Sequence, residues 1–164
     1  MELRLPDEAA TVRAGTALAQ ALPDLSRGTF LVALSGELGS GKTTLARAML
    51  RTLGVQGAVR SPTFTLVEPY ETSRGPVHHL DLYRLDGSAA ALEGIGFRDL
   101  RGQPGLLLVE WPERAGPGLG TPDLDVRLAP EGTGRRISLR ARTPGGRELL
   151  ERSREQLEKN GVSH

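Results

Sequence analysis

The sequence predicts a single α/β domain with a mixed, mainly parallel central sheet, and three observations carry this prediction. The apolar runs at residues 30–34 and 106–109 have the composition of strands buried on both faces of a parallel sheet. A helical pattern follows the first run, with apolar residues at four-residue steps from Leu45. Residues 123–129 and 135–141 alternate between polar and apolar around the turn PEGTG, which predicts a C-terminal antiparallel hairpin.

Two helices are expected in the N-terminal third, after a short strand at residues 3–5. The first begins after Asp7, whose side chain is a suitable cap, and ends before Pro23. Its buried stripe is expected to hold Val12, Ala19 and Leu22. The second helix runs from Thr44 to Leu53 and stops at Gly54.

The middle of the chain predicts two more strands and a broken helix. A turn at Ser61–Pro62 precedes a strand that begins at about Phe64. In the strand PVHHLDLYRL, alternation puts His79, Asp81 and Tyr83 on one face. The helical stretch at residues 88–100 is interrupted at two glycines, Gly94 and Gly96.

Length and composition indicate one domain with its own core. We expect the domain to span residues 1–145, followed by a polar, loosely attached helix and tail at residues 146–164. The net charge of +1 does not favour nonspecific attraction to nucleic acid, and the absence of cysteine excludes thiolate metal sites. The sequence contains no apolar run long enough to predict a membrane segment, so a cytoplasmic protein is expected.

The segment GELGSGKTT has the spacing Gly36-x-x-x-x-Gly41-Lys42-Thr43, which is typical of phosphate-binding loops. Gly39 and Gly41 let backbone N–H groups approach an anion, and the following helix turns its N-terminus towards the same anion. Lys42 supplies a mobile positive charge for phosphate oxygens, and Thr43 a hydroxyl for Mg²⁺. The alternative is a glycine-rich turn that only caps a helix.

The predicted nucleotide is ATP or ADP, by elimination. Guanine-selective proteins of this class carry an Asn/Thr-Lys-x-Asp signature, and the only other lysine, Lys159, is followed by Asn160 and Gly161. That signature is therefore excluded.

Two carboxylates are candidates for the chemistry. Glu110 ends an apolar strand, where an acid can organise Mg²⁺ or water, although a strand end can also carry an acid for structural reasons. Asp81 shares a strand with His79; this pair suggests a catalytic acid, part of a transition-metal site, or the polar face of a half-exposed strand.

Other residues have two interpretations each. Thr63 suits a switch that senses a γ-phosphate, or a simple turn residue. Trp111 is interpreted as a core residue at a strand end, and because it follows Glu110 directly it is expected to lie near the nucleotide. The arginines of the hairpin suit a solvated face or contact with an acidic partner or RNA phosphate; they are Arg136, Arg140 and Arg142.

The motifs GELGSGKTT, SPTFTLVEPY, HHLDLYRL and LLLVEWPER, in this order, closely resemble the bacterial tRNA threonylcarbamoyladenosine biosynthesis ATPase family TsaE, over about residues 5–143. The resemblance implies a P-loop NTPase-like three-layer fold and slow ATP hydrolysis. It also implies action with TsaB and TsaD, which transfer threonylcarbamoyl to N6 of adenosine 37 in tRNAs that read codons beginning with A. Direct contact with tRNA stays open.

The resemblance also assigns site residues. Lys42 is implied as the phosphate lysine, Thr43 and Glu110 as metal-linked residues, and Asp81 as an essential acid. Further nucleotide contacts are implied for Glu8, Thr11, Gly39, Ser40, Gly41, Thr44, Thr63 and Arg135; Ser40 stands where alanine is usual in the family.

Two other functions fit the glycine loop alone. A small-molecule kinase would need an acceptor pocket and a lid over the phosphates. A nucleotide-gated binding module would use hydrolysis only to end a docked state.

Overall fold

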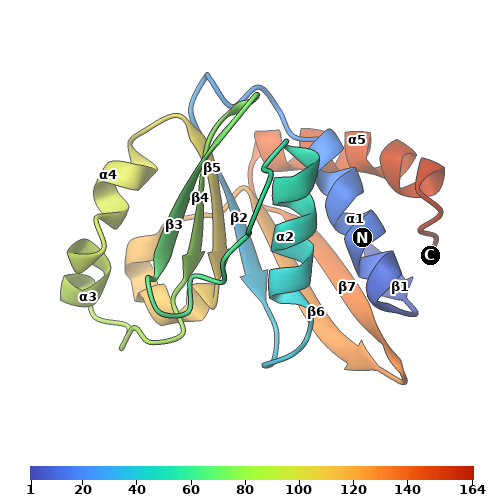
Figure 1. Cartoon of the computed structure of the whole chain (residues 1–164), viewed down its shortest axis with the longest axis horizontal. Helices are drawn as coiled ribbons and strands as arrows, with labels where there is room; N and C mark the ends of the chain where they lie inside the picture. The colour runs from blue at the N-terminus through green and yellow to red at the C-terminus, as the bar shows by residue number, and fades with distance from the viewer.

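The computed structural model describes all 164 residues and contains one seven-stranded sheet, in the order β1-β7-β6-β2-β5-β4-β3 (Figure 1). The strands are β1 (Glu2–Leu5), β2 (Thr29–Ser35), β3 (Val67–Thr72), β4 (Gly75–Asp81), β5 (Gly105–Glu110), β6 (Leu124–Glu131) and β7 (Gly134–Ala141). The pairs β6–β2, β2–β5 and β5–β4 are parallel, and the pairs towards both edges are antiparallel. The mixed α/β sheet and the β6–β7 hairpin predicted from the sequence are confirmed.

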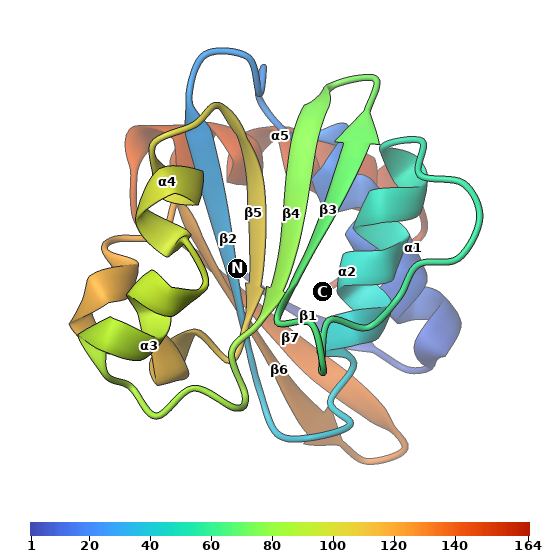
Figure 2. The ribbon, with the colours of Figure 1, turned by 60° about the vertical axis from the view of Figure 1, so that its left-hand side comes forward.

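Helices cover both faces of this sheet, as Figure 2 shows, which completes the predicted three layers. The helices are α1 (Glu8–Gln20), α2 (Lys42–Thr52), α3 (Ala89–Gly94), α4 (Phe97–Arg101), a 3₁₀ segment η1 (Pro112–Leu119) and α5 (Pro144–Lys159). Alternate residues of β2 separate two cores: Val32 and Leu34 pack with α1, α2 and α5, whereas Leu31 and Ala33 pack with α3, α4 and η1. The sheet is therefore buried on both faces, as its apolar strands predict.

Helix α1 begins where the sequence predicts. The Asp7 side chain accepts a hydrogen bond from the backbone N–H of Ala10 at 2.7 Å, which satisfies one free donor of the first turn. The prediction that Val12 lies in the buried stripe is wrong, because this residue is 41% exposed. Small residues bury this helix against α2 instead: Gly15 faces Ala48 and Leu45, with no space for a larger side chain.

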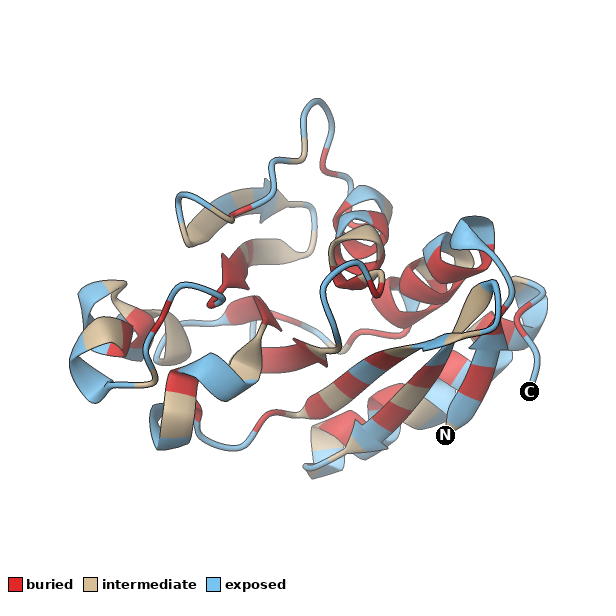
Figure 3. Ribbon diagram, turned by 90° about the horizontal axis from the view of Figure 1, so that it is seen from below, coloured by how far each residue is buried: buried red, intermediate tan, exposed pale blue.

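The C-terminal helix α5 is not loosely attached. It starts at Pro144, capped by the Thr143 hydroxyl, and its residues Leu149 and Leu157 belong to the larger core. Thr143 also donates to the carboxylate of Asp123, which in turn accepts the backbone N–H of Leu31. Only Gly146, Leu149, Ser153 and Leu157 of α5 are buried, so its polar composition belongs to the face that it turns to solvent. Figure 3 shows the same mixture of buried and exposed residues around the helices of the chain.

Two strand boundaries differ from the prediction. β3 begins at Val67, and Phe64 lies in a turn with 80% of its surface exposed. β4 ends at Asp81, so that Tyr83 lies beyond the strand. The interpretation of β4 as a half-exposed strand is wrong, because both His79 and Asp81 are buried.

The arginines of the hairpin form part of a solvated face. Arg136 pairs with Glu131 and Glu2, and Arg142, which lies beyond the end of β7, pairs with Asp125 at 3.6 Å.

In this structure, no helix is both long enough and apolar enough to span a bilayer.

Candidate functional site

The candidate site lies where three parallel strands end at the same edge of the sheet. β4 ends at Asp81 and β5 at Glu110, and these two residues are directly paired in register. The loop of residues 36–43, called here the glycine loop, follows β2 at this edge and leads into α2. Together they line a cleft of about 220 Å³, formed by Leu38, Gly39, Gly41, Lys42, Thr43, Thr44, Thr63, Asp81, Glu110, Trp111 and Arg135.

The glycine loop depends on backbone conformations that side chains disfavour. Gly41 is the N-cap residue of α2 and has a φ of 104°, in the region that glycine adopts freely. A Cβ atom on Gly36 would collide with the backbone oxygen of Leu128 in β6, and its φ is 145°. The loop can therefore direct the free N–H groups of the first turn of α2 towards an anion in the cleft.

Lys42 is buried in the cleft wall, and its ammonium bonds the backbone of the glycine loop. Its Nζ donates to the backbone oxygens of Gly36 at 2.7 Å and Glu37 at 2.9 Å. The same Nζ lies 4.2 Å from the centre of the Trp111 ring, within the range of a cation–π interaction. Burial lowers the pKa of Lys42 below its ordinary value of 10.5, although the nearby carboxylates, led by Glu110, oppose this shift.

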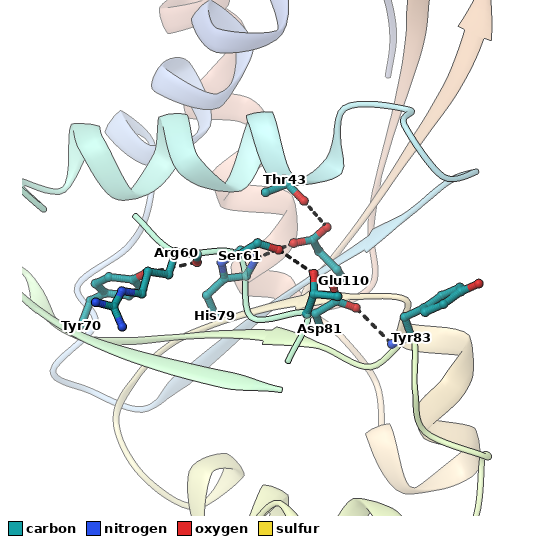
Figure 4. Close-up of polar contacts among 9 residues, drawn as sticks. Thr43, Arg60, Ser61, Tyr70, His79, Asp81, Tyr83 and Glu110 are labelled. Carbon is teal, nitrogen blue, oxygen red and sulfur yellow. Dashed lines mark hydrogen bonds and ion pairs between the residues drawn. The ribbon is translucent and has the colours of Figure 1, made fainter. Parts of the chain in front are cut away.

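Glu110 is held from two sides (Figure 4). Its Oε1 accepts a hydrogen bond from the Thr43 hydroxyl at 2.8 Å, and its Oε2 lies 2.6 Å from Nε2 of His79. His79 is fully buried and Glu110 is 2% exposed. The carboxylate thus sits against the first turn of α2 in one defined orientation.

Asp81 connects the sheet to the loop that carries Thr63. One carboxylate oxygen accepts the backbone N–H of Tyr83 at 3.0 Å, and the other lies 3.4 Å from the Thr63 hydroxyl, which also bonds Ser61 at 2.7 Å. Burial raises the pKa of the Asp81 carboxyl above its ordinary value of 3.8, and the N–H of Tyr83 opposes this. A buried acid of this kind, with its pKa brought nearer to neutrality, suits proton transfer better than an exposed carboxylate does.

Arg135 covers the other side of the glycine loop. It lies at the start of β7, and its guanidinium atoms would approach a Cβ on Gly41 to 3.2–3.3 Å. One guanidinium nitrogen donates to the buried hydroxyl of Thr11 at 3.2 Å. The structure therefore brings Thr11 and Arg135 together beside the loop, from segments 124 residues apart in sequence.

Three candidate residues do not line the cleft: Thr11, which bonds Arg135, and also Glu8 and Ser40. Glu8 lies exposed in the first turn of α1, and Ser40 is buried with its hydroxyl oxygen unpartnered. Trp111, interpreted as a core residue, is half-buried with a φ of 56°: it packs on the smaller core and lines the cleft as well. Its ring lies 5.0 Å from that of Tyr83.

The sequence interpretation missed the contact between His79 and Glu110. The signal was present in the strand alternation, which puts His79 and Asp81 on one face of β4. What the sequence alone could not supply is the register that sets this face beside the end of β5.

Comparison with known proteins agrees with the motifs. The family model of the threonylcarbamoyl adenosine biosynthesis protein TsaE matches residues 5–137. The chain belongs to the TsaE family. It is 39% identical over 147 residues to the tRNA threonylcarbamoyladenosine biosynthesis protein TsaE of Haemophilus influenzae, covering 89% of this chain and 92% of that protein. It is 42% identical over 121 residues to the TsaE of Synechocystis, covering 70% and 71% of the two chains.

A solved structure has the same fold. The crystal structure of YdiB from Bacillus subtilis superposes with a TM-score of 0.67 at 25% sequence identity, covering 94% of each chain. The region matched by the TsaE model contains the whole cleft, from the glycine loop to Arg135. The helix α5 lies beyond that region.

The donor atoms in this TsaE cleft fit Mg²⁺ better than a transition metal. The hydroxyl of Thr43 and the carboxylate of Glu110 lie side by side at 2.8 Å, and hard oxygen donors of this kind are those that Mg²⁺ prefers. In the structure, no group of three or more His, Cys, Asp or Glu residues is arranged to hold a metal ion. Mg²⁺ commonly keeps several waters and takes only one or two protein ligands, so this pair suffices.

Proposed function

We propose that this TsaE protein binds ATP with Mg²⁺ in the cleft and hydrolyses it slowly. The hydrolysis would serve the formation of N6-threonylcarbamoyladenosine at position 37 of tRNAs that read codons beginning with A, in cooperation with TsaB and TsaD. One observation carries the proposal: Lys42, Thr43, Glu110 and Asp81, from three separate segments, converge on one cleft at the N-terminus of α2.

Phosphate binding would use the glycine loop and Lys42. The ammonium now rests on two backbone oxygens, and phosphate oxygens with full negative charge are stronger acceptors for it. Lys42 would exchange these partners and move off the Trp111 ring, so the indole should report nucleotide binding.

Metal binding and water activation would use the oxygens at the strand ends. Thr43 and Glu110 would hold Mg²⁺, which when bound supplies charge to neutralise the phosphates. Asp81 would accept a hydrogen bond, and then the proton, from the water that attacks the γ-phosphate, and Thr63 would hold the carboxylate in position. The raised pKa of Asp81 supports this role.

The nucleoside would lie on the side of Arg135. A second hollow, of about 360 Å³, shares Arg135 with the cleft and is lined further by Leu5, Pro6, Thr133 and Gly134. The guanidinium is planar and can stack on a base, which supports an adenosine site between α1 and the hairpin. Thr11 would act through Arg135.

The proposed partners have an exposed apolar rim to contact. Leu38, which lines the cleft, is 82% exposed, and Phe64, which follows Thr63, is 80% exposed. Tyr83 is 46% exposed, and its ring lies beside that of Trp111. Exposed apolar side chains around a site are a common mark of protein contacts. A partner bound there would sense whether nucleotide is present.

ATPase assays of the chain alone, and with TsaB and TsaD, test the proposal. We expect slow release of phosphate from ATP by the chain alone and faster release with both partners. Glu110→Gln keeps the shape and removes the charge, so nucleotide binding should persist while hydrolysis falls about tenfold or more. Full stimulated activity in Glu110→Gln would contradict the metal assignment, and transfer of phosphate to a small-molecule acceptor would favour a kinase.

A further inference from the structure

We propose that His79 is a positioning residue for Mg²⁺: it fixes the Glu110 carboxylate against Thr43 and so sets the metal affinity of the cleft. The inference rests on the proposed function, because it concerns the metal that accompanies the nucleotide. It assigns a role to a buried side chain that is not among the residues that line the cleft.

The geometry is set by the strand register. β4 and β5 run parallel with His79 opposite Leu108 and Asp81 opposite Glu110. The imidazole therefore lies behind the cleft wall, two residues before the end of β4, and reaches Oε2 of Glu110 at 2.6 Å. Figure 4 shows the ring on the side of Glu110 away from Thr43.

The two carboxylate oxygens have separate donors. The Thr43 hydroxyl bonds Oε1, and the proton on Nε2 of His79 serves Oε2, because an ionised carboxylate only accepts. Thr43 is itself a proposed metal ligand, whereas His79 is not. The contact from His79 is thus the one that can hold Glu110 in place before and after a metal binds.

The other ring nitrogen of His79 indicates that this contact matters. Nδ1 is buried without any hydrogen-bond partner. A side chain that served only the packing of a fully buried site would be apolar, because an unpartnered polar atom in the interior is unfavourable. Hydrogen bonds to ligating carboxylates commonly alter metal affinity by about 10-fold to 100-fold when they are removed.

A purely structural role is the competing explanation. In that case His79 would only satisfy a buried oxygen of Glu110, and its loss would lower stability without affecting metal binding selectively. The two explanations differ in one measurable quantity: the ratio of nucleotide affinities with and without Mg²⁺.

Two substitutions of equal chemistry and different reach provide the test. The amide nitrogen of a glutamine at position 79 lies near the place of Nε2, whereas that of an asparagine lies near Nδ1 and falls short of Glu110. We expect His79→Asn to leave the affinity for a non-hydrolysable ATP analogue in EDTA within about twofold, and to reduce the enhancement by Mg²⁺ about 10-fold to 100-fold. His79→Gln should retain most of the enhancement, and the neighbouring His78→Asn serves as the control.

Calorimetric titration measures these affinities, and each outcome decides a different point. Equal enhancement by Mg²⁺ in His79→Asn and the wild type would overturn the positioning role. A wild-type protein that binds the analogue equally with and without Mg²⁺ would overturn it as well. A wild-type protein that does not bind the analogue at all would refute the proposed function instead.

A measurement without substitution guards against variants that fail to fold. The chain has 3 histidines, so ¹⁵N-histidine NMR of the wild type gives few signals. We expect one buried imidazole with its proton on Nε2, whose Nε2 signal moves when Mg²⁺ is added to the complex with ADP. An Nε2 signal that does not respond to Mg²⁺ would overturn the proposal.

Discussion

Replacing Lys42 with methionine separates ligand binding from folding. The substitution keeps the length and apolar volume of the side chain and removes the ammonium. In the folded chain Lys42 is 4% exposed, and burial lowers the pKa of its ammonium. Two effects follow, one on nucleotide affinity and one on stability.

The effect on affinity follows from the contacts that the ammonium makes. Two hydrogen bonds from a charged donor contribute about 1.5–3 kcal/mol each, and Lys42 must first give up the two backbone oxygens that it bonds in the free protein. The bonds to phosphate are the stronger set, because phosphate oxygens carry charge and backbone oxygens do not. We therefore expect a net loss of about 2–4 kcal/mol, which weakens ATP binding by about 30-fold to about 700-fold.

The effect on stability has the opposite sign. Because burial lowers the pKa of Lys42, the unfolded chain holds more protons than the folded one between the folded pKa and 10.5. Stability therefore rises with pH through that window, and below it the buried ammonium is a cost. Lys42→Met should accordingly show a Tm at pH 7 equal to or above that of the wild type.

Titration of ATP and Mg²⁺ against Trp111 fluorescence, followed by thermal denaturation, measures both effects. Lys159→Met is the matched control, since Lys159 is the only other lysine and is exposed beside Glu155. An affinity within threefold of the wild type would show that Lys42 does not bind phosphate. A Tm lowered by about 5 °C or more would show that the ammonium stabilises the free loop, and would refute the stability argument.

Three further predictions address the switch, the buried acid and the C-terminal helix. Thr63→Ala should leave the affinity for ADP within about twofold and reduce the preference for ATP over ADP by about 2-fold to 10-fold in calorimetry, because the Thr63 hydroxyl is proposed to sense the γ-phosphate. Equal losses of affinity for both nucleotides would show that Thr63 has only a structural role. Asp81→Asn should raise Tm at pH 7. Burial raises the pKa of Asp81, so above pH 3.8 the folded state holds more protons than the unfolded state, and the wild type loses stability as the pH rises to the folded pKa. The gain in Tm from the substitution should therefore shrink towards pH 3.8, and a lower Tm than that of the wild type at pH 7 would contradict this. Leu149→Ala removes a side chain that is 1% exposed and should lower stability by about 2–5 kcal/mol and Tm by about 5–20 °C, whereas the half-buried Leu150→Ala should lose less than half as much; equal small losses would mean that α5 is not part of the core.

The sequence predicts the centre of the fold well because that part is specified locally. Short continuous apolar runs are typical of strands covered by helices on both faces, and β2 and β5 are such runs. The caps of α1 and the glycine loop are also local signals, since Asp7 bonds a backbone group three residues away.

The errors lie where distant contacts decide the structure. The strand after the turn was expected from Phe64, but Leu66 adopts a φ of 65° and accepts the backbone N–H of Asp81, so pairing with β4 begins only at Val67. Val12 is exposed because α1 packs on α2 through small residues such as Gly15, which hydrophobic periodicity does not reveal.

The sequence predicts which residues belong to the candidate site, but it does not predict the contacts between them. Motif spacing identifies Lys42 and Thr43, and a strand end identifies Glu110, because each signal is contained in a few residues. The contacts of His79 with Glu110 and of Arg135 with Thr11 join segments that are 31 and 124 residues apart. Only the sheet order brings them together, and no local pattern encodes that order.

The buried polar residues are concentrated at the cleft, which indicates that the unfavourable burial of polar groups is concentrated there too. Of the seven buried polar or charged residues, Lys42, Asp81 and Glu110 line the cleft, and His79 and Thr11 contact residues that do. The ion pairs elsewhere in the chain lie at the surface, where such pairs contribute little. Burying a charge is unfavourable, so a ligand that neutralises the charges of the cleft should stabilise the whole chain. The rise in Tm with ATP and Mg²⁺ should therefore disappear in Lys42→Met.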